Sequence, residues 1–166
     1  MPDPLVTIAR EALSAAVRGE PYAPTALDAP LDRSRGVFVT LEKAGELRGC
    51  IGHLAPTLPT LAEEVATVAV LAGTRDSRFP PVSPEELGSL QTSISLLSVP
   101  EPTTEDALDA RRYGVIVTSG HRRGVLLPDL EGVDTPADQI RICRRKAGIP
   151  PHAPVTLERF TVEKRT

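Results

Sequence analysis

The chain has 166 residues, of which 40% are hydrophobic and 25% are charged, a composition typical of a globular protein with a sizeable core. Its formal net charge of −3 disfavours binding of nucleic acid through the overall field of the protein. The sequence contains no run of about 20 apolar residues that would span a bilayer, and its first residues lack the basic start and apolar run of a signal peptide. We therefore expect a cytoplasmic protein without membrane association, formed by one domain over residues 1–166.

The N-terminal segment predicts a helix. Asp3 is suited to the N-cap and Pro4 to the first helical position, and the helix is expected to stop near Gly19. Residues 20–34 contain repeated prolines and are expected to form a long connecting loop. The apolar stripe of the helix comprises Leu5, Ile8, Ala9, Ala12, Ala15 and Ala16.

The first half of the chain continues with the pattern of two strands, a helix and a third strand. The two strands are separated by turn signals, as in a β-hairpin. The helix begins with a threonine and a glutamate at capping-box spacing and is apolar almost all round, so we expect it to be buried. These elements are predicted at Gly36–Thr40, Leu47–Gly52, 60–72 and Gln91–Ser98, respectively.

The second half of the chain repeats this order. Gly114–Thr118 matches Gly36–Thr40 at four of five positions. We therefore expect two β-β-α-β repeats, over residues 36–99 and 114–163. The predicted fold class is α+β, with one largely antiparallel, barrel-like sheet and an extra N-terminal helix. The later elements of the second repeat are predicted at Gly124–Leu127, 135–147 and Val155–Val162.

The predicted strand Leu47–Gly52 breaks the usual composition of a strand. It contains two glycines, an arginine and a cysteine, and glycine inside a strand often marks a close approach of ligand or backbone. The corresponding strand of the second repeat has the plain apolar run Val125–Leu127. We infer that the fold itself does not demand the unusual residues, and that they mark a functional site.

Alternation of side chains along a strand places Arg48 and Cys50 on the same face. A guanidinium beside a thiol favours the thiolate, which is the reactive form, and Gly49 and Gly52 would leave backbone N–H groups open to a ligand. Cys50 is then a candidate nucleophile, with Arg48 as its activator or as an anion clamp. The alternative is that Cys50 is a small buried hydrophobe, with Arg48 in a structural ion pair.

Two further stretches are candidates for the same site. His53 is the nearest base, but alternation places it on the face opposite Cys50 unless the strand bends. The loop after the central helix carries Asp76, Arg78 and Phe79. These residues either form a self-paired Asp–Arg turn with Phe79 in the core, or line the same cleft as Arg48 and Cys50.

Neither a metal nor a cofactor is indicated. The two cysteines form no CxxC, and together with the three histidines they lack recognisable ligand spacing. Cys143 lies on the apolar face of the last predicted helix and is expected in the core. Arg141 and Arg145 share the solvent face of that helix, and the chain has only two Tyr, three Phe and no Trp to stack on bases, so nucleic acid is not an expected partner.

The hexapeptide LRGCIG at 47–52 and the loop RFPPV at 78–82 resemble motifs of the AMMECR family, also called protein A of the AmmeMemoRadiSam system. The chain departs from the family pattern after Pro128, where members typically have Gln-Val and a longer connection. Further matches extend the resemblance over most of the chain, at Phe38–Leu41, Ser93–Ser95, Leu126–Pro128 and Cys143–Gly148.

The resemblance implies an α+β fold of two β/α repeats with one barrel-like sheet, in a family whose molecular function is not established. It also implies Memo-like and radical-SAM proteins as partners, and this chain lacks the CxxxCxxC of the radical-SAM component itself. The family motif is suspected to be an active or binding site. The matching positions here are Arg48, Gly49, Cys50, Gly52, Asp76 and Arg78.

Three hypotheses follow for the function. The leading one is a cleft, built from residues 47–53 and 74–80, that binds a small molecule or a modified substrate, with Cys50 and Arg48 as the catalytic candidates. The second is a non-catalytic module that docks on Memo-like or radical-SAM proteins, and the third, an accessory of RNA modification, rests on basic clusters alone. The binding residues of the leading hypothesis are Gly49, Gly52, His53, Asp76, Arg78 and Phe79.

Overall fold

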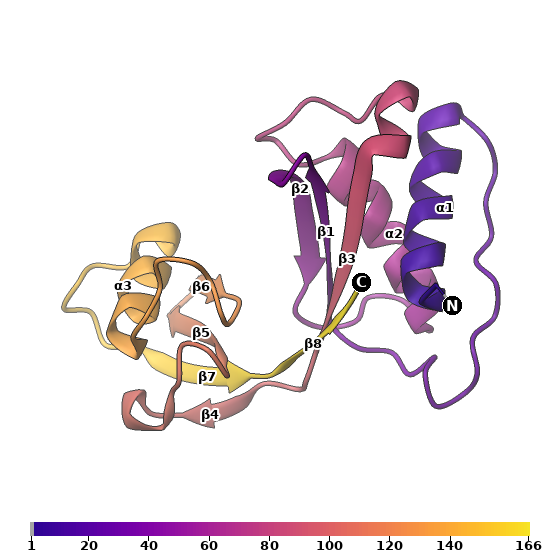
Figure 1. Ribbon diagram of the computed structural model, residues 1–166. Helices are drawn as coiled ribbons and strands as arrows, with labels where there is room; N and C mark the ends of the chain where they lie inside the picture. Colours follow the sequence, from indigo (N-terminus) through magenta and orange to yellow (C-terminus); the bar gives the residue numbers. More distant parts are fainter. Residues whose placement is uncertain (1) are drawn as a thin grey trace. The chain divides into compact units, whose positions relative to one another are not determined.

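The computed structural model describes residues 2–166, which form two compact units (Figure 1). Unit 1 contains the chain up to Leu97 together with Glu163–Thr166, and unit 2 contains Ser98–Val162. Each unit has its own sheet and its own hydrophobic core. Over residues 2–166, no helix has the length and apolar character needed to cross a membrane.

Unit 1 is a four-stranded sheet covered by two helices. The strand order is β2-β1-β3-β8, and β1 pairs antiparallel with both β2 and β3. Helices α1 and α2 pack against each other and against the sheet, α2 on β1 and β2 and α1 on β3 (Figure 1). The elements are α1 (Pro4–Arg18), β1 (Val37–Lys43), β2 (Glu46–His53), α2 (Leu61–Thr74), the 3₁₀ helix η1 (Pro84–Ser89), β3 (Leu90–Leu97) and β8 (Val162–Arg165).

Local sequence explains the ends of the helices in unit 1. The side chain of Asp3 accepts the N–H of Leu5 at 2.8 Å, and Gly19 ends α1 in the left-handed region with φ 71°. Thr60 caps α2 by accepting the N–H of Glu63 at 3.2 Å. The two predicted helices and the N-caps Asp3 and Thr60 are therefore confirmed, while α2 runs to Thr74, beyond the predicted end at residue 72. Their apolar faces meet alternate strand residues, among which Val37, Val39, Leu41, Ile94 and Leu96 are buried.

Unit 2 is a second four-stranded sheet with one helix. The strand order is β4-β7-β5-β6, with all three pairs antiparallel. Helix α3 packs on β5 and β6; Thr135 caps its start and Gly148, with φ 68°, ends it. The elements are β4 (Glu101–Thr103), the 3₁₀ helix η2 (Glu105–Ala107), β5 (Gly114–Ser119), β6 (Arg122–Leu126), α3 (Pro136–Ala147) and β7 (Thr156–Phe160).

The predicted α+β class is confirmed, but the single barrel-like sheet is wrong. The strands of residues 2–166 form two sheets, neither of them closed, because each hairpin pairs with the strand that follows its own helix. The order β-β-α-β occurs in both units, as β1-β2-α2-β3 and β5-β6-α3-β7. The single domain over residues 1–166 and the internal repeat over 36–99 and 114–163 stay predictions.

One glycine in each hairpin allows a helix to approach the sheet closely. A Cβ at Gly49 of β2 would collide with the carbonyl oxygen of Ala72 in α2, and a Cβ at Gly124 of β6 would collide with that of Cys143 in α3. The same packing therefore requires glycine in both units. Gly49 is demanded by the architecture, contrary to the expectation drawn from Val125–Leu127.

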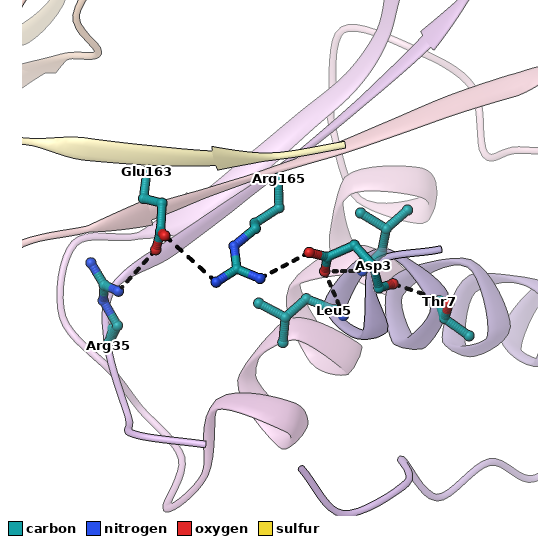
Figure 2. A network of polar contacts seen from close by, with 7 residues as sticks. Asp3, Leu5, Thr7, Arg35, Glu163 and Arg165 are labelled. Atoms are coloured by element: carbon teal, nitrogen blue, oxygen red, sulfur yellow. Dashed lines mark hydrogen bonds and ion pairs between the residues drawn. The ribbon is translucent and has the colours of Figure 1, made fainter. Parts of the chain in front are cut away.

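The last strand ties the end of the chain to the start of α1. Arg165 donates to the Oδ2 atom of Asp3 at 2.9 Å, while the other oxygen of Asp3 caps the helix (Figure 2). Glu163 accepts from Arg165 and from Arg35, each at 3.5 Å (Figure 2). Asp3 thus joins two parts of unit 1 that are far apart in sequence, in addition to its predicted role as the N-cap.

Candidate functional site

Strand β2 contains a bulge that changes the direction of Arg48. Across the β1–β2 ladder, Leu41 pairs with Gly49 while the next residue, Glu42, pairs with Leu47, so Arg48 is the extra residue of β2. Side chains before and after a bulge no longer alternate strictly. The prediction that Arg48 and Cys50 share a face rested on that alternation, and the register does not support it.

The guanidinium of Arg48 is bound to Glu86 of η1. Its Nε and Nη2 atoms donate to the two carboxylate oxygens of Glu86 at 2.9 and 3.1 Å, and Lys43 adds a third bond at 3.1 Å. Arg48, followed by the N–H of Ser83, holds the pKa of Glu86 well below its usual range. This geometry matches the alternative of a structural ion pair for Arg48. The role of Arg48 as activator of Cys50 stays a prediction, which this ion pair does not favour.

Beyond the bulge, the side chains of β2 do alternate. Gly49 faces α2 and Ile51 packs on the core of unit 1. Cys50 belongs to the other set: it is half-buried, and its Sγ atom lies 3.3 Å from the hydroxyl of Thr40, the residue opposite it on β1. Thr40 was missed by sequence reasoning, because only the pairing register identifies the neighbour of Cys50.

The two glycines do not leave open space beside the sulfur. The position of a side chain at Gly49 is filled by the carbonyl of Ala72, and that at Gly52 by the ring of Phe38. Both glycines therefore serve packing in the first place. Their predicted role in exposing backbone N–H groups to a ligand stays a prediction without support from these contacts.

The loop after α2 meets Cys50 through Asp76. Asp76 is only 8% exposed, and its Oδ2 atom accepts the backbone N–H of Cys50 at 3.0 Å. Since β2 is an edge strand, this carboxylate caps an N–H group that has no strand partner. The contact places the loop directly beside the Cys50 segment, while a common cleft lined by both stays a prediction.

The same carboxylate holds Arg78 in a bidentate pair. The Nε and Nη2 atoms of Arg78 donate to Asp76 at 3.0 and 2.8 Å, and the N–H of Arg78 adds a bond at 3.1 Å. The hydrogen bonds from Arg78 are the main cause that lowers the pKa of Asp76, against the effect of burial. The self-paired Asp–Arg turn of the first interpretation is therefore also present. Asp76 links a strand residue and a loop cation at one point.

Arg78 is the cation near Cys50 that remains accessible. Its side chain is 56% exposed and lies over the ring of Phe79, with 5.4 Å to the ring centroid. The pKa of Arg78 is raised, chiefly by the hydrogen bonds to Asp76. Phe79 is half-buried under this guanidinium. Arg78 thus combines a link to Cys50, made through Asp76, with exposure to an incoming ligand.

His53 lies on the helix side of β2. Its Nδ1 atom is 3.0 Å from the Oε1 atom of Glu64, a fully buried carboxylate of α2. Glu64 also accepts the N–H groups of Thr57 and Leu58 at 3.1 and 2.9 Å. The position agrees with the alternation that separated His53 from Cys50, and its role in binding stays a prediction. Glu64 was missed by sequence reasoning.

The second cysteine provides a contrast within the same chain. Cys143 is fully buried on the inner face of α3, and burial raises the pKa of its thiol to about 11. The prediction that Cys143 is a core residue is confirmed. Between residues 2 and 166, no three side chains of His, Cys, Asp or Glu come together in a way that could hold a metal ion.

Comparisons with known proteins agree with one another. A protein of Thermotoga maritima is 53% identical over 135 residues, covering 80% of this chain and 78% of that protein. A protein of Clostridium acetobutylicum is 42% identical over 166 residues, covering 98% of this chain but only 36% of its own length, so this chain spans about a third of that relative. The crystal structure of an uncharacterised protein from Pyrococcus horikoshii has a TM-score of 0.87 at 32% identity, covering 96% of this chain and 88% of that one.

The family assignment rests on nearly the whole chain. The AMMECR1 family model matches residues 6–165, which include both units and every residue of the site around Cys50. The fold of the Pyrococcus protein, at the stated identity, is the same. The chain therefore belongs to the AMMECR1 family.

Proposed function

We propose that unit 1 binds a ligand or substrate at Cys50, with Cys50 as a reactive thiol, Arg78 as the cation that meets an anionic group, and Asp76 as the residue that positions both. The observation that supports this most is the bonding of Asp76. One buried carboxylate holds the backbone of Cys50 at 3.0 Å and the guanidinium of Arg78 at 2.8 Å. The same bonds cap an edge-strand N–H group, and they also fix the thiol-bearing residue and an exposed guanidinium on one carboxylate.

The chemistry of this arrangement suits a thiolate that attacks an electrophilic carbon. A nearby cation favours the thiolate over the thiol, and Thr40 offers a hydroxyl 3.3 Å from the sulfur that can donate to it. Because Arg78 remains exposed, it is available to a carboxylate or phosphate of the substrate while still bonded to Asp76. The preferred substrate is therefore a small electrophile that carries an anionic group.

Alkylation with iodoacetamide tests the reactivity of Cys50 with Cys143 as an internal control. The reagent forms a bond from sulfur to carbon and releases iodide, and peptide mapping assigns the modified cysteine. We expect Cys50 to be modified in the folded chain and Cys143 only after unfolding, because Cys143 is fully buried. If neither cysteine reacted before unfolding, Cys50 would be a core residue and the proposal would fail.

A second candidate function is a module that docks on Memo-like or radical-SAM proteins. The Clostridium relative, in which a region similar to this chain makes up 36% of a longer protein, supports an association with a further protein region, and the family resemblance supplies the candidate partners. Co-purification with such a protein, using the wild type and Cys50→Ser, distinguishes the two candidates. If Cys50→Ser still binds the partner but the activity of the partner is lost, a reactive site is supported. If Cys50→Ser binds and the activity of the partner is unchanged, a pure interface is supported.

A further inference from the structure

Unit 2 carries a groove beside α3, between this helix, the turn that follows it and Glu105 of η2. Its volume is about 580 Å³, within the range of about 300–1,000 Å³ found for binding pockets. Its lining combines aliphatic side chains with guanidinium groups. The lining residues are Glu105, Ala137, Ile140, Arg141, Arg144, Arg145, Ile149 and Pro151.

The aliphatic part of the groove is anchored in the structure. Ile149 is buried, and Ile140 packs on the core of unit 2 with part of its side chain accessible. Arg144 holds the turn after α3 in place, because it donates to the carbonyl oxygens of Pro150 and Ala153 at 2.7 and 3.0 Å. The groove thus has a fixed wall and an apolar floor rather than a loose surface loop.

Two other arginines remain available at the rim. The side chain of Arg141 is 61% exposed and meets Asp138 through one nitrogen at 3.1 Å. Arg145 is exposed, and none of the ion pairs within residues 2–166 involves it. Residues four apart on a helix lie about 6 Å from each other on the same side, so Arg141 and Arg145 present two guanidiniums to one partner.

The charge of the groove is strongly one-sided. It is lined by three arginines and a single acid, Glu105. Arginine pairs with carboxylates through two parallel hydrogen bonds and is enriched at protein interfaces. A partner that places carboxylates over the rim and aliphatic groups on the floor complements both features.

We propose that this groove is a docking site for an acidic amphipathic helix of a partner protein. Two carboxylates spaced by one helical turn would pair with Arg141 and Arg145, and aliphatic side chains between them would pack on Ile140 and Ile149. None of the residues that line this groove belongs to the Cys50 site, and the proposal does not rest on the function proposed for that site. RNA is disfavoured as the occupant, because the chain has only two Tyr, three Phe and no Trp for stacking.

Selection from a library of displayed random peptides of about 15 residues, long enough for four helical turns, tests the proposal on the full chain. We expect the enriched peptides to combine Asp or Glu with Leu, Ile or Phe. Their affinity should fall by about tenfold or more in Arg145→Glu and should weaken as salt is raised. The matched control is Arg111→Glu, the same charge change at an exposed arginine outside the groove, which should bind as the wild type does.

Mapping of amide chemical shifts keeps the test independent of whether Arg145→Glu folds. In the wild-type chain, the enriched peptide should shift the amides of residues 137–151. The proposal is overturned if the selected peptides carry no excess of acids, if they bind Arg145→Glu as tightly as the wild type, or if the shifts lie elsewhere. It is equally overturned if single-stranded RNA, but no acidic peptide, binds in an Arg145-dependent manner.

Discussion

The two hairpins of this protein share a scaffold and differ in what the loop after the helix does. In both units a glycine of the second strand lets the helix backbone approach, Gly49 in unit 1 and Gly124 in unit 2. In unit 1 the loop after α2 carries Asp76, whose buried carboxylate accepts the N–H of Cys50. In unit 2 the following loop is held by Arg144 and Arg122, which donate to its carbonyl oxygens.

The comparison of the two units distinguishes the residues of β2 that serve packing from those that are candidates for function. The residue after the glycine is Cys50 in unit 1 and Val125 in unit 2. Because Gly124 is present where no cysteine follows, the glycine is explained by packing alone. Unit 2 has Val125 at the position of Cys50, so the combination of thiol, carboxylate and guanidinium at Cys50, Asp76 and Arg78 belongs to unit 1, and our proposal assigns its chemical role to these three residues.

The largest loss of stability is expected where a helix backbone approaches the sheet, at Gly49 and at Gly124. Gly49→Ala and Gly124→Ala should each lower the free energy of unfolding by about 3 kcal/mol, because the new methyl group would collide with the carbonyl of Ala72 or Cys143. Gly88→Ala, where the added methyl group meets open space, is the matched control. Urea denaturation measures all three. A tolerated Gly49→Ala beside a damaging Gly124→Ala would show that the two strands are not equivalent.

Asp76→Asn should have the next largest effect, about 2 kcal/mol of lost stability, since a buried carboxylate that accepts bonds from Cys50 and Arg78 loses its charge. The alkylation rate of Cys50 should fall with it. Asp138→Asn on α3 is the control, because its carboxylate meets Arg141 at the surface, and its unfolding midpoint should stay close to that of the wild type. An equal loss of stability in Asp76→Asn and Asp138→Asn would show that Asp76 contributes no more than a surface carboxylate.

Acid should weaken unit 1 through Asp76 and Glu86. Their ordinary pKa is about 4, and in the folded chain Arg78 and Arg48, respectively, hold the pKa of each carboxyl well below that value. The stabilisation is therefore complete above the ordinary pKa and is lost as the pH falls through the lower, folded pKa. Urea denaturation between about pH 5 and pH 2 should show this loss, and a double variant Asp76→Asn/Glu86→Gln should have a flatter profile. A wild-type profile as flat as that of the double variant would contradict the prediction.

The smallest expected effect concerns the network in Figure 2. Arg165→Met should lower the free energy of unfolding by about 0.5 kcal/mol, because Arg165 is partly exposed and Asp3 keeps its bond to the N–H of Leu5. Asp3→Ala should cost more, since it removes both the cap and the ion pair. Thermal unfolding ranks the two variants. The reverse order would show that the ion pair outweighs the cap.

Local patterns predicted the elements of this fold but not their partners. Asp3 and Gly19 identified the ends of α1 because capping is decided within a few residues. Alternation of apolar residues indicated strands, but it does not specify which strand lies beside which, so the two sheets were expected as one.

At the candidate site, too, the local motifs were predicted and most of their long-range partners were not. LRGCIG and the loop with Asp76 and Arg78 were recognised, and their contact at Cys50 is present. The hydrogen bond between Arg48 and Glu86 joins residues 38 positions apart in the sequence. It occurs at a β-bulge that no local sequence pattern predicted. Alternation across that bulge predicted a common face for Arg48 and Cys50, whereas the guanidinium linked to Cys50 through Asp76 is that of Arg78.

Two variants test whether Arg78, rather than Arg48, activates the thiol of Cys50. We compare the rate of Cys50 alkylation in Arg78→Gln and in Arg48→Gln, both in a Cys143→Ala background. The account predicts a rate several-fold below wild type in Arg78→Gln, because the cation beside the thiolate is lost. It predicts a nearly unchanged rate in Arg48→Gln under conditions where that variant remains folded. A slower reaction in Arg48→Gln with an unchanged rate in Arg78→Gln would contradict it and would return the activating role to Arg48.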